Sequence, residues 1–374
     1  MFITGLGTAT PPHRYTQIEC WEAFQAAAQF AQLDRRARAT LQRVLLHDNG
    51  IRTRSLALAT LAEAFAIDPD TLHRRFALHA PALAGDAATR ALQQAGLGPH
   101  EVDAVVISTC TGYLCPGLSS YVGASLGLRP DVFALDLVGQ GCGAALPNLR
   151  AAAALLRADE CRKVLSICVE VCSAAFYLDN DPGVLISACL FGDGAGAAVL
   201  AAEPAAAGRS IEWVAAGSLH NPAERDALRF GHTDGMLRNI LSPRVPRLAA
   251  GHAAAVLDDV LGRRGMSRDD IATWIWHAGG RKVMEALRES LELAAGDVAW
   301  SSKVLSEFGN VSSPSVYFAL QAALAGNAPG GWWWMSSFGA GFSCHGALLK
   351  VAQAPAPGAR GLEFTDEHCA HRRA

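Results

Sequence analysis

The chain has 374 residues, of which 51% are hydrophobic and 18% are charged, and its net charge is -3. This much apolar material predicts a large fold or two joined halves rather than one small core. The near-neutral charge excludes a global basic field that would attract nucleic acid or an anionic membrane. No apolar run reaches the ~18 residues of a membrane span, so we expect no stable insertion into a bilayer.

The first ten residues lack the basic leader of a signal peptide and instead predict a strand over residues 2–5. Ten cysteines lie mostly in apolar segments without an even disulfide framework. The pairs Cys110/Cys115 and Cys168/Cys172 lack the spacing of zinc ligands. These features favour a cytoplasmic protein with reduced thiols and no bound metal.

Further along the chain, residues 16–95 carry helical periodicity, with breaks at residues 48–50 and around Pro69, and the last helix ends at Gly96. A long alanine-rich helix is predicted over residues 143–156. Buried strands are predicted over residues 102–108, 132–137, 164–171 and 196–200. Apolar strands that alternate with helices predict an α/β fold whose central strands are covered on both faces.

A weak internal repeat relates two parts of the chain. Laying Thr109 on His277, an offset of 168 residues, also lays Cys142 on Asn310. A further match pairs residues 191–194 with residues 338–341. We therefore expect two duplicated strand–helix halves, residues 1–203 and 204–352, whose pseudo-twofold axis brings Cys142, His277 and Asn310 to corresponding places.

The last segment, residues 353–374, begins with alternating alanine and proline and predicts a flexible tail. His368, Cys369 and His371 lie in this tail, where an unstructured end is the better interpretation than a metal site.

Cys142 is the candidate nucleophile because it follows a strand, lies between two glycines and precedes a helix. Its small neighbours leave room for a substrate, and the start of a helix favours thiolate over thiol. Taken alone, Cys142 could equally be a core thiol. His277 follows an apolar strand and precedes two glycines, although a lone histidine there is more often structural. Asn310 taken alone would be a helix N-cap.

The chemistry explains why these three residue types would be combined. A thiolate takes an acyl group from CoA and holds it as a thioester. A second thioester with a carboxylate on its α-carbon then loses carbon dioxide, and the enolate oxygen that forms needs two hydrogen-bond donors. A histidine N–H and an asparagine amide supply them without a metal or a cofactor.

The sequence resembles the type III polyketide synthases, the chalcone synthase-like family of homodimeric thiolase-fold enzymes. The resemblance runs over nearly all of residues 1–351. It is carried by segments whose order and separations match together: Gly7–Pro12, Gly141-Cys142, Leu190–Ala195, His277–Gly280, Gly309–Ser313 and Phe338–Gly341. It implies a thiolase fold of two pseudo-symmetric α/β halves with layered αβαβα architecture, and an acyltransferase that condenses malonyl-CoA onto an acyl-CoA starter.

The resemblance also implies roles for individual residues. Cys142, His277 and Asn310 are the expected catalytic triad, and Phe191 and Phe230 are the expected aromatic gatekeepers. The expected walls of the substrate cavity are Ala175, Cys115 (which would reach across the dimer), Ser312, Asn221, Gly339 and Ala340. Candidates for contacts with the CoA phosphates are Arg43, Arg52 and Arg54.

Several positions depart from the family pattern. Ala278 stands where a threonine usually follows the catalytic histidine, and Ser337 and Ala340 replace a glycine and a proline in the loop near the C-terminus. The small side chains of Ala175, Cys115 and Ser312 favour a fatty acyl starter and a pyrone or resorcinol-type product. Two alternatives stay open: a β-ketoacyl-acyl-carrier-protein synthase III-like enzyme, and a catalytically silent thiolase-fold dimer.

Overall fold

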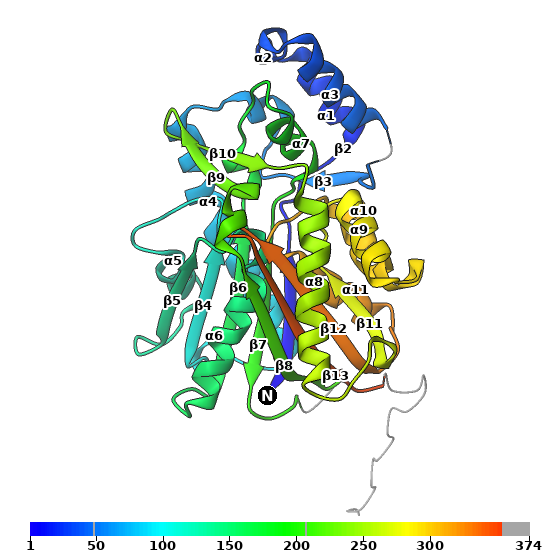
Figure 1. Ribbon diagram of the computed structural model, residues 1–374. Helices are drawn as coiled ribbons and strands as arrows, with labels where there is room; N and C mark the ends of the chain where they lie inside the picture. Colours follow the sequence, from blue (N-terminus) through cyan, green and yellow to red (C-terminus); the bar gives the residue numbers. More distant parts are fainter. Residues whose placement is uncertain (48, 206–207, 354–374) are drawn as a thin grey trace, which may run out of the picture.

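The computed structural model describes residues 1–47, 49–205 and 208–353, so the predicted tail, apart from Gln353, lies outside the described residues. A sheet of nine strands runs through the molecule (Figure 1), in the order β11–β12–β13–β8–β1–β7–β6–β4–β5. The first half of the chain supplies β1 (Phe2–Ala9), β4 (Ala104–Thr109), β5 (Phe133–Val138), β6 (Lys163–Glu170) and β7 (Gly194–Ala201). The second half supplies β8 (Ile211–His220), β11 (Ile271–Trp276), β12 (Gly331–Gly339) and β13 (Ser343–Val351).

The two halves repeat one strand order. β1, β7, β6 and β4 follow one another in the first half as β8, β13, β12 and β11 do in the second, and β1 pairs with β8 where the halves meet. The pairs β4/β6 and β11/β12 are parallel, whereas β6/β7 and β12/β13 are antiparallel. The offset of 168 residues seen in the sequence carries the start of β6 at Lys163 onto the start of β12 at Gly331. The prediction of two pseudo-symmetric α/β halves is confirmed.

The two half-sheets form two layers of the molecule, and helices form three more, one between the half-sheets and one on each outer face. α6 (Ala145–Arg157) and α11 (Ser315–Ala325) contact strands of both halves and make up the middle layer. α4 (Pro69–Ala95) and α5 (Leu118–Leu126) cover the outer face of the first half-sheet. α8 (Val245–Gly262) and α9 (Arg281–Leu291) cover that of the second. Each helix layer packs on the sheet through its own apolar cluster. Helix and sheet layers therefore alternate in the predicted αβαβα order.

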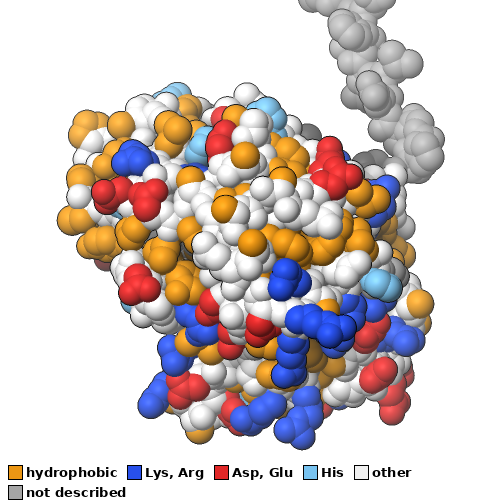
Figure 2. Space-filling view, turned by 90° about the horizontal axis from the view of Figure 1, so that it is seen from above, with side chains coloured by type: hydrophobic (Ala, Val, Ile, Leu, Met, Phe, Trp, Pro, Cys, Tyr) orange, Lys and Arg blue, Asp and Glu red, His pale blue; other side chains and the backbone are white. Residues whose placement is uncertain are grey.

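A cap of shorter elements lies over one end of the sheet (Figure 1). Its members include β2 (Arg14–Thr16), α1 (Gln17–Ala26), α2 (Ala28–Gln32), α3 (Arg35–Leu46), β3 (Thr53–Ser55), α7 (Pro182–Leu190), β9 (Leu228–Thr233) and β10 (Met236–Leu241). α1, α3 and α7 share an apolar cluster of their own. Figure 2, which looks onto this end, shows arginine and lysine side chains gathered over one part of the face.

Helical periodicity over residues 16–95 predicted α1, α2, α3 and α4, but it is wrong for residues 51–66. Those residues form β3 and a short 3₁₀ turn, Leu61–Phe65, because β3 pairs with β2 along the edge of the cap. α10 (Ala299–Phe308) completes the described helices.

Within the described residues, none of the helices has the length and apolar character needed to cross a membrane.

The close contact of β1 with α4 depends on two glycines. A Cβ added to Gly7 would lie 2.2 Å from the carbonyl oxygen of Ala87, and one added to Gly5 would lie 2.1 Å from that of Ala91. Both neighbours are helix backbone, which has little freedom to move away. The strand therefore rests directly on the helix, with no side chain between them.

Gly7→Ala should lower the free energy of unfolding by about 1–3 kcal/mol, the scale of overpacking, in urea denaturation. Gly251→Ala is the matched control, since Gly251 lies on the exposed side of α8 and its added Cβ would meet nothing within 4 Å. Alanine's helix propensity should make that variant more stable by up to about 1 kcal/mol. Equal stability of the two variants would contradict the tight packing of β1 on α4.

Candidate active site

Cys142 lies in a 3₁₀ turn, Gly141–Gly143, between the end of β5 and the start of α6. Gly141 has a φ of 57°, in the left-handed region that glycine adopts without strain. A Cβ on Gly141 would lie 2.9 Å from the backbone nitrogen of Ala340, and one on Gly143 would lie 3.1 Å from that of Gly339. The end of β12 thus packs against the turn that carries Cys142, and side chains on the flanking residues would separate them.

The thiol of Cys142 is held by a hydroxyl from the other half of the molecule. Ser312 Oγ donates to Cys142 Sγ at 3.2 Å. Burial nevertheless raises the pKa of Cys142 to about 12, and the nearby Glu170 carboxyl also raises it. The hydrogen bond from Ser312 lowers this pKa but does not cancel the effect of burial. Burial therefore works against the thiolate that the start of the helix favours. A base must accept the proton when an acyl group arrives.

His277 follows the last residue of β11 and is buried. Burial lowers the pKa of its imidazole to about 3, so the ring is neutral at physiological pH and has a nitrogen that can accept a proton. Its Nδ1 hydrogen-bonds with Ser315 Oγ at the start of α11. The ring of Phe338 packs edge-on against it, with centroids 5.0 Å apart. These two contacts fix the plane of the imidazole.

Asn310 lies five residues before the start of α11, so it is not the cap of that helix. Its Nδ2 donates to the carbonyl oxygen of Gly279 at 3.2 Å, and its Oδ1 accepts from the backbone nitrogen of Ser312 at 2.9 Å. The backbone of Asn310 is bonded to that of Leu190 and Gly192, on either side of Phe191. A buried amide fixed at this many points is pre-organised to donate its second N–H to a ligand.

A short chain of contacts links the three predicted catalytic residues. Cys142 is hydrogen-bonded to Ser312, and Ser312 is hydrogen-bonded to Asn310. Asn310 is hydrogen-bonded to Gly279, whose backbone nitrogen donates to the carbonyl oxygen of His277 at 2.8 Å. Within the described residues no hydrogen bond joins Cys142 directly to His277 or Asn310. Residues separated by 168 positions and carried by different halves therefore meet at one place, as the internal repeat predicted.

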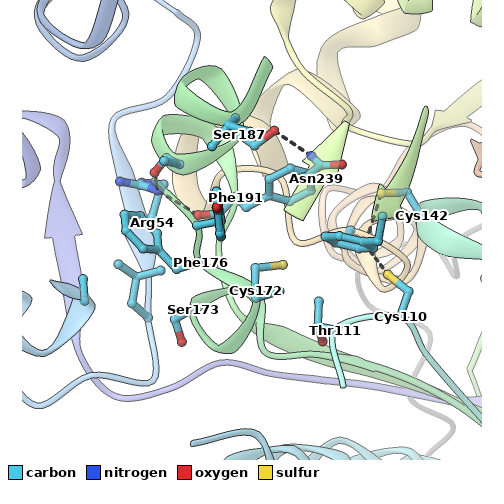
Figure 3. Close-up of a pocket in the computed structure, with 18 of the residues that line it drawn as sticks. Arg54, Cys110, Thr111, Cys142, Cys172, Ser173, Phe176, Ser187, Phe191 and Asn239 are labelled. Carbon is cyan, nitrogen blue, oxygen red and sulfur yellow. Dashed lines mark hydrogen bonds between the residues drawn. The ribbon is translucent and has the colours of Figure 1, made fainter. Parts of the chain in front are cut away.

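A cavity opens beside Cys142 (Figure 3), with a volume of about 1070 Å³ including its mouth. Five of the predicted wall and gate residues line it: Ala175, Phe191, Phe230, Ser312 and Ala340. One part of the lining, called the apolar arm below, comes from the cap and is apolar apart from the buried Arg54. Its lining residues come from α1, the segment 56–65 and the start of the segment after β6: Cys20, Ala23, Phe24, Leu56, Leu58, Leu61, Ala64, Phe65 and Phe176.

Three predicted wall residues do not line this cavity. Cys115 is exposed in the loop between β4 and α5. Asn221 exchanges two backbone hydrogen bonds with Phe342. Gly339 packs against the Cys142 turn instead, where its added Cβ would lie 2.4 Å from the backbone nitrogen of Gly143. It acts on the shape of the site through that contact.

The predicted CoA contacts separate into two kinds. Arg54 is buried, and its guanidinium donates to the carbonyl oxygens of Ala188 and Phe191 and to Cys20 Sγ. Its assignment to a CoA phosphate is wrong in this structure, because the side chain is buried and both of its terminal NH₂ groups are bonded inside the cap. Arg43 and Arg52 are exposed, and their assignment stays a prediction.

Sequence reasoning missed a buried carboxylate beside the nucleophile. Glu170, at the end of β6, accepts hydrogen bonds from Ser313 Oγ at 2.5 Å, from Thr111 Oγ1 at 2.9 Å and from the backbone nitrogen of Cys110 at 3.0 Å. Burial raises its pKa despite these bonds. The signal was present, since Glu170 is the one acidic residue in an apolar strand that ends beside the active site.

Fold and geometry together define a condensing acyltransferase of the thiolase fold. Residues 1–204 match the family described as chalcone and stilbene synthases, N-terminal domain, and residues 261–351 match the C-terminal domain of 3-oxoacyl-[acyl-carrier-protein (ACP)] synthase III. The chain therefore belongs to the chalcone and stilbene synthase family and is a type III polyketide synthase.

Relatives with known names agree with this assignment. The chain is 32% identical to 1,3,6,8-tetrahydroxynaphthalene synthase of Streptomyces peucetius subsp. caesius, over 93% of this chain and 92% of that protein. It is 31% identical to the alpha-pyrone synthesis polyketide synthase-like Pks18 of Mycobacterium tuberculosis, over 85% and 82% of the two chains. The crystal structure of PKS-I from the brown alga Ectocarpus siliculosus superposes with a TM-score of 0.83 at 27% identity, covering 93% and 97%.

Alkylation of Cys142 by iodoacetamide should accelerate about tenfold for each unit of pH through the neutral and alkaline range, because only the thiolate reacts and the pKa lies near 12. Peptide mass spectrometry separates this site from the exposed Cys115, whose labelling in the same sample reports on the reagent. A rate that levels off near neutral pH would show a thiolate already formed at rest.

Proposed function

We propose that this enzyme extends an acyl-CoA starter by repeated decarboxylative condensation with malonyl-CoA, with the growing chain held on Cys142. The observation that carries the proposal is the contact chain from Cys142 through Ser312, Asn310 and Gly279 to His277. It supports one catalytic unit built from both halves. Substrates that are CoA thioesters agree with the cytoplasmic location that the sequence predicts.

Each member of the unit has a distinct task. On loading, neutral His277 accepts the proton of Cys142, the sulfur attacks the thioester carbonyl, and CoA leaves as its thiolate, so His277 keeps the proton. Malonyl-CoA then loses carbon dioxide, and its enolate oxygen accepts hydrogen bonds from a His277 N–H and from Asn310 Nδ2. The enolate carbon attacks the acyl-Cys142 thioester and expels the sulfur, which recovers its proton from His277. The chain is then a CoA thioester two carbons longer, and it returns to Cys142 with release of CoA before the next extension.

A second candidate is a synthase III-like enzyme that performs one condensation with an acyl carrier protein. The match of residues 261–351 to the synthase III C-terminal domain favours it. The two candidates separate on incubation with malonyl-CoA and an acyl-CoA alone. Products of several extensions support the polyketide synthase, and a requirement for acyl carrier protein supports the alternative. A silent dimer would release no carbon dioxide in either case.

Asn310→Ala should reduce carbon dioxide release from malonyl-CoA by roughly 10²-fold, the scale of losing one donor to a developing oxyanion. His277→Ala should reduce it at least as much and should also slow acyl transfer to Cys142, because the thiol loses its base. Intact-protein mass spectrometry reports the acyl adduct. Unchanged decarboxylation in Asn310→Ala would reduce this residue to a structural role.

We propose a fatty acyl-CoA starter, two or three extensions, and release as an alkylpyrone or alkylresorcinol. The apolar arm of the cavity supports this, because its walls are aliphatic, aromatic or thiol side chains that offer an alkyl chain a dry surface. The small side chain of Ala175 is among the residues that line the same cavity. The name of the Mycobacterium tuberculosis relative, an alpha-pyrone synthesis protein, agrees with this product class.

Longer starters should therefore have lower KM values until the arm is full, since each buried methylene contributes ~0.8 kcal/mol at most. Ala175→Trp should lower the ratio of kcat/KM for long over short acyl-CoA starters. Ala62→Trp is the matched control, because Ala62 is exposed and does not line the cavity. An unchanged ratio in Ala175→Trp, or a wild type that prefers aromatic or acetyl starters, contradicts this assignment.

We propose further that the enzyme is a homodimer joined along β5. This strand lies at the edge of the sheet, and exposed apolar side chains surround it, with 49% exposure for Phe133, 58% for Val138 and 69% for Tyr113. An exposed sheet edge with an apolar border is typical of an interface. Cys115 lies in the adjoining loop, where it could enter the cavity of the partner subunit, as the family resemblance implies.

Phe133→Asp should shift the sedimentation coefficient from dimer to monomer, because a carboxylate would be buried in an apolar contact. Ile18→Asp is the control, an equally exposed apolar residue on α1 and away from the sheet edge. A wild type that sediments as a monomer would refute the dimer, whereas a dimer that both substitutions leave intact would refute the interface along β5.

A further inference from the structure

One wall of the substrate cavity carries a fixed polar pair, Asn239 of β10 and Ser187 of α7. Asn239 is 8% exposed and donates from Nδ2 to Ser187 Oγ at 2.6 Å. Ser187 Oγ donates in turn to the carbonyl oxygen of Gly183 at 2.7 Å, within its own helix. The pair thus joins the β9–β10 hairpin to α7 at the cavity surface.

This arrangement decides which end of the amide faces the substrate. A serine hydroxyl has one hydrogen, and Ser187 uses it on Gly183. Ser187 must therefore accept from Asn239, which places Nδ2 against the helix and leaves Oδ1 on the other side. Figure 3 shows the oxygen directed away from Ser187, toward the side of the cavity where Cys142 lies. Among the described residues, none donates a hydrogen bond to this oxygen.

The cavity therefore presents an acceptor on a largely buried side chain, in a neighbourhood that includes the apolar residues Val184, Leu228 and Phe230. An acceptor in such surroundings selects for a ligand group that can donate, since an unpaired buried oxygen is unfavourable. A ketone carbonyl cannot donate. The enol form of a β-ketoacyl chain can, through its hydroxyl.

We propose that Asn239 Oδ1 binds an enol hydroxyl of the growing polyketide chain and holds that chain in position for further extension. The inference rests on the proposed function and gives one wall of the same cavity a role in holding the growing chain. Asn239 is a positioning residue: it favours the enol tautomer at one carbonyl and keeps the chain from folding back and leaving early. Ser187 keeps the amide turned in the productive direction.

The test is the product distribution of Asn239→Leu, which keeps the approximate size of the side chain and removes the acceptor. Products from malonyl-CoA and the preferred acyl-CoA are quantified by mass spectrometry and normalised to carbon dioxide released by the same variant. The ratio of early-released to full-length products should rise roughly three- to tenfold, the scale of one hydrogen bond. Asn239→Asp retains an acceptor oxygen and should stay nearer to the wild-type ratio.

Ser187→Ala supplies an independent measurement, because it leaves Asn239 in place but allows its amide to turn. We expect a shift in the same direction and of smaller size. If Asn239→Leu has a lowered melting temperature, the product ratio of Ser187→Ala tests the proposal in its place.

Two results would overturn the proposal. One is an unchanged product ratio in both variants. The other is an increased KM for the acyl-CoA starter with an unchanged ratio, which would assign Asn239 to an amide N–H of the CoA pantetheine arm. Failure of the proposed function is distinguishable from both, since the wild type would then release no carbon dioxide from malonyl-CoA.

Discussion

The active site depends on the close approach of two backbones, the turn Gly141–Gly143 and the end of β12. A Cβ on Gly339 would lie 2.4 Å from the backbone nitrogen of Gly143, and one on Gly141 would lie 2.9 Å from that of Ala340. The first backbone belongs to the first half of the chain and the second to the duplicated half. Because these halves touch without intervening side chains, the thiol of Cys142 is linked through Ser312 to the carboxamide that the other half carries.

The same burial sets the protonation states of the resting enzyme. Desolvation favours the neutral form of each group, so the pKa of Cys142 is raised and that of His277 is lowered. Thiol and imidazole are both uncharged until substrate arrives, and an ion pair does not have to be stabilised in the empty site. Charge develops during acyl transfer and decarboxylation, where Asn310 and His277 can offer hydrogen bonds to it. A pre-organised site of this kind needs little rearrangement at the moment of reaction.

The sequence was sufficient to predict the two halves and the residues that meet at the site, because these follow from apolar strands, glycine turns and one repeat offset. The αβαβα layers were implied by the resemblance to the family. It was insufficient where tertiary burial outweighs a local rule. The helix start at Cys142 favours a thiolate, yet burial raises the pKa of the thiol. Arg54 looked like a surface cation, but pairing of β3 with β2 turns it inward to backbone carbonyls. The role of Asn239 was invisible, since it depends on a hydrogen bond from Ser187 to Gly183 in another element.

The residues proposed for the condensation chemistry and those that line the substrate cavity thus come mainly from different parts of the chain. Cys142, His277 and Asn310 stand at the ends of core elements that two duplicated halves hold in register. The walls that shape the growing chain come mainly from the cap: α1, the segment 56–65, α7 and the β9–β10 hairpin. Asn310 is bonded to the backbone on both sides of Phe191, at the end of α7, so the cap is also tied to the catalytic unit. Substitutions on the far side of the cap can therefore change the product while leaving the thiol, the imidazole and the carboxamide in place, whereas changes near Phe191 act on both.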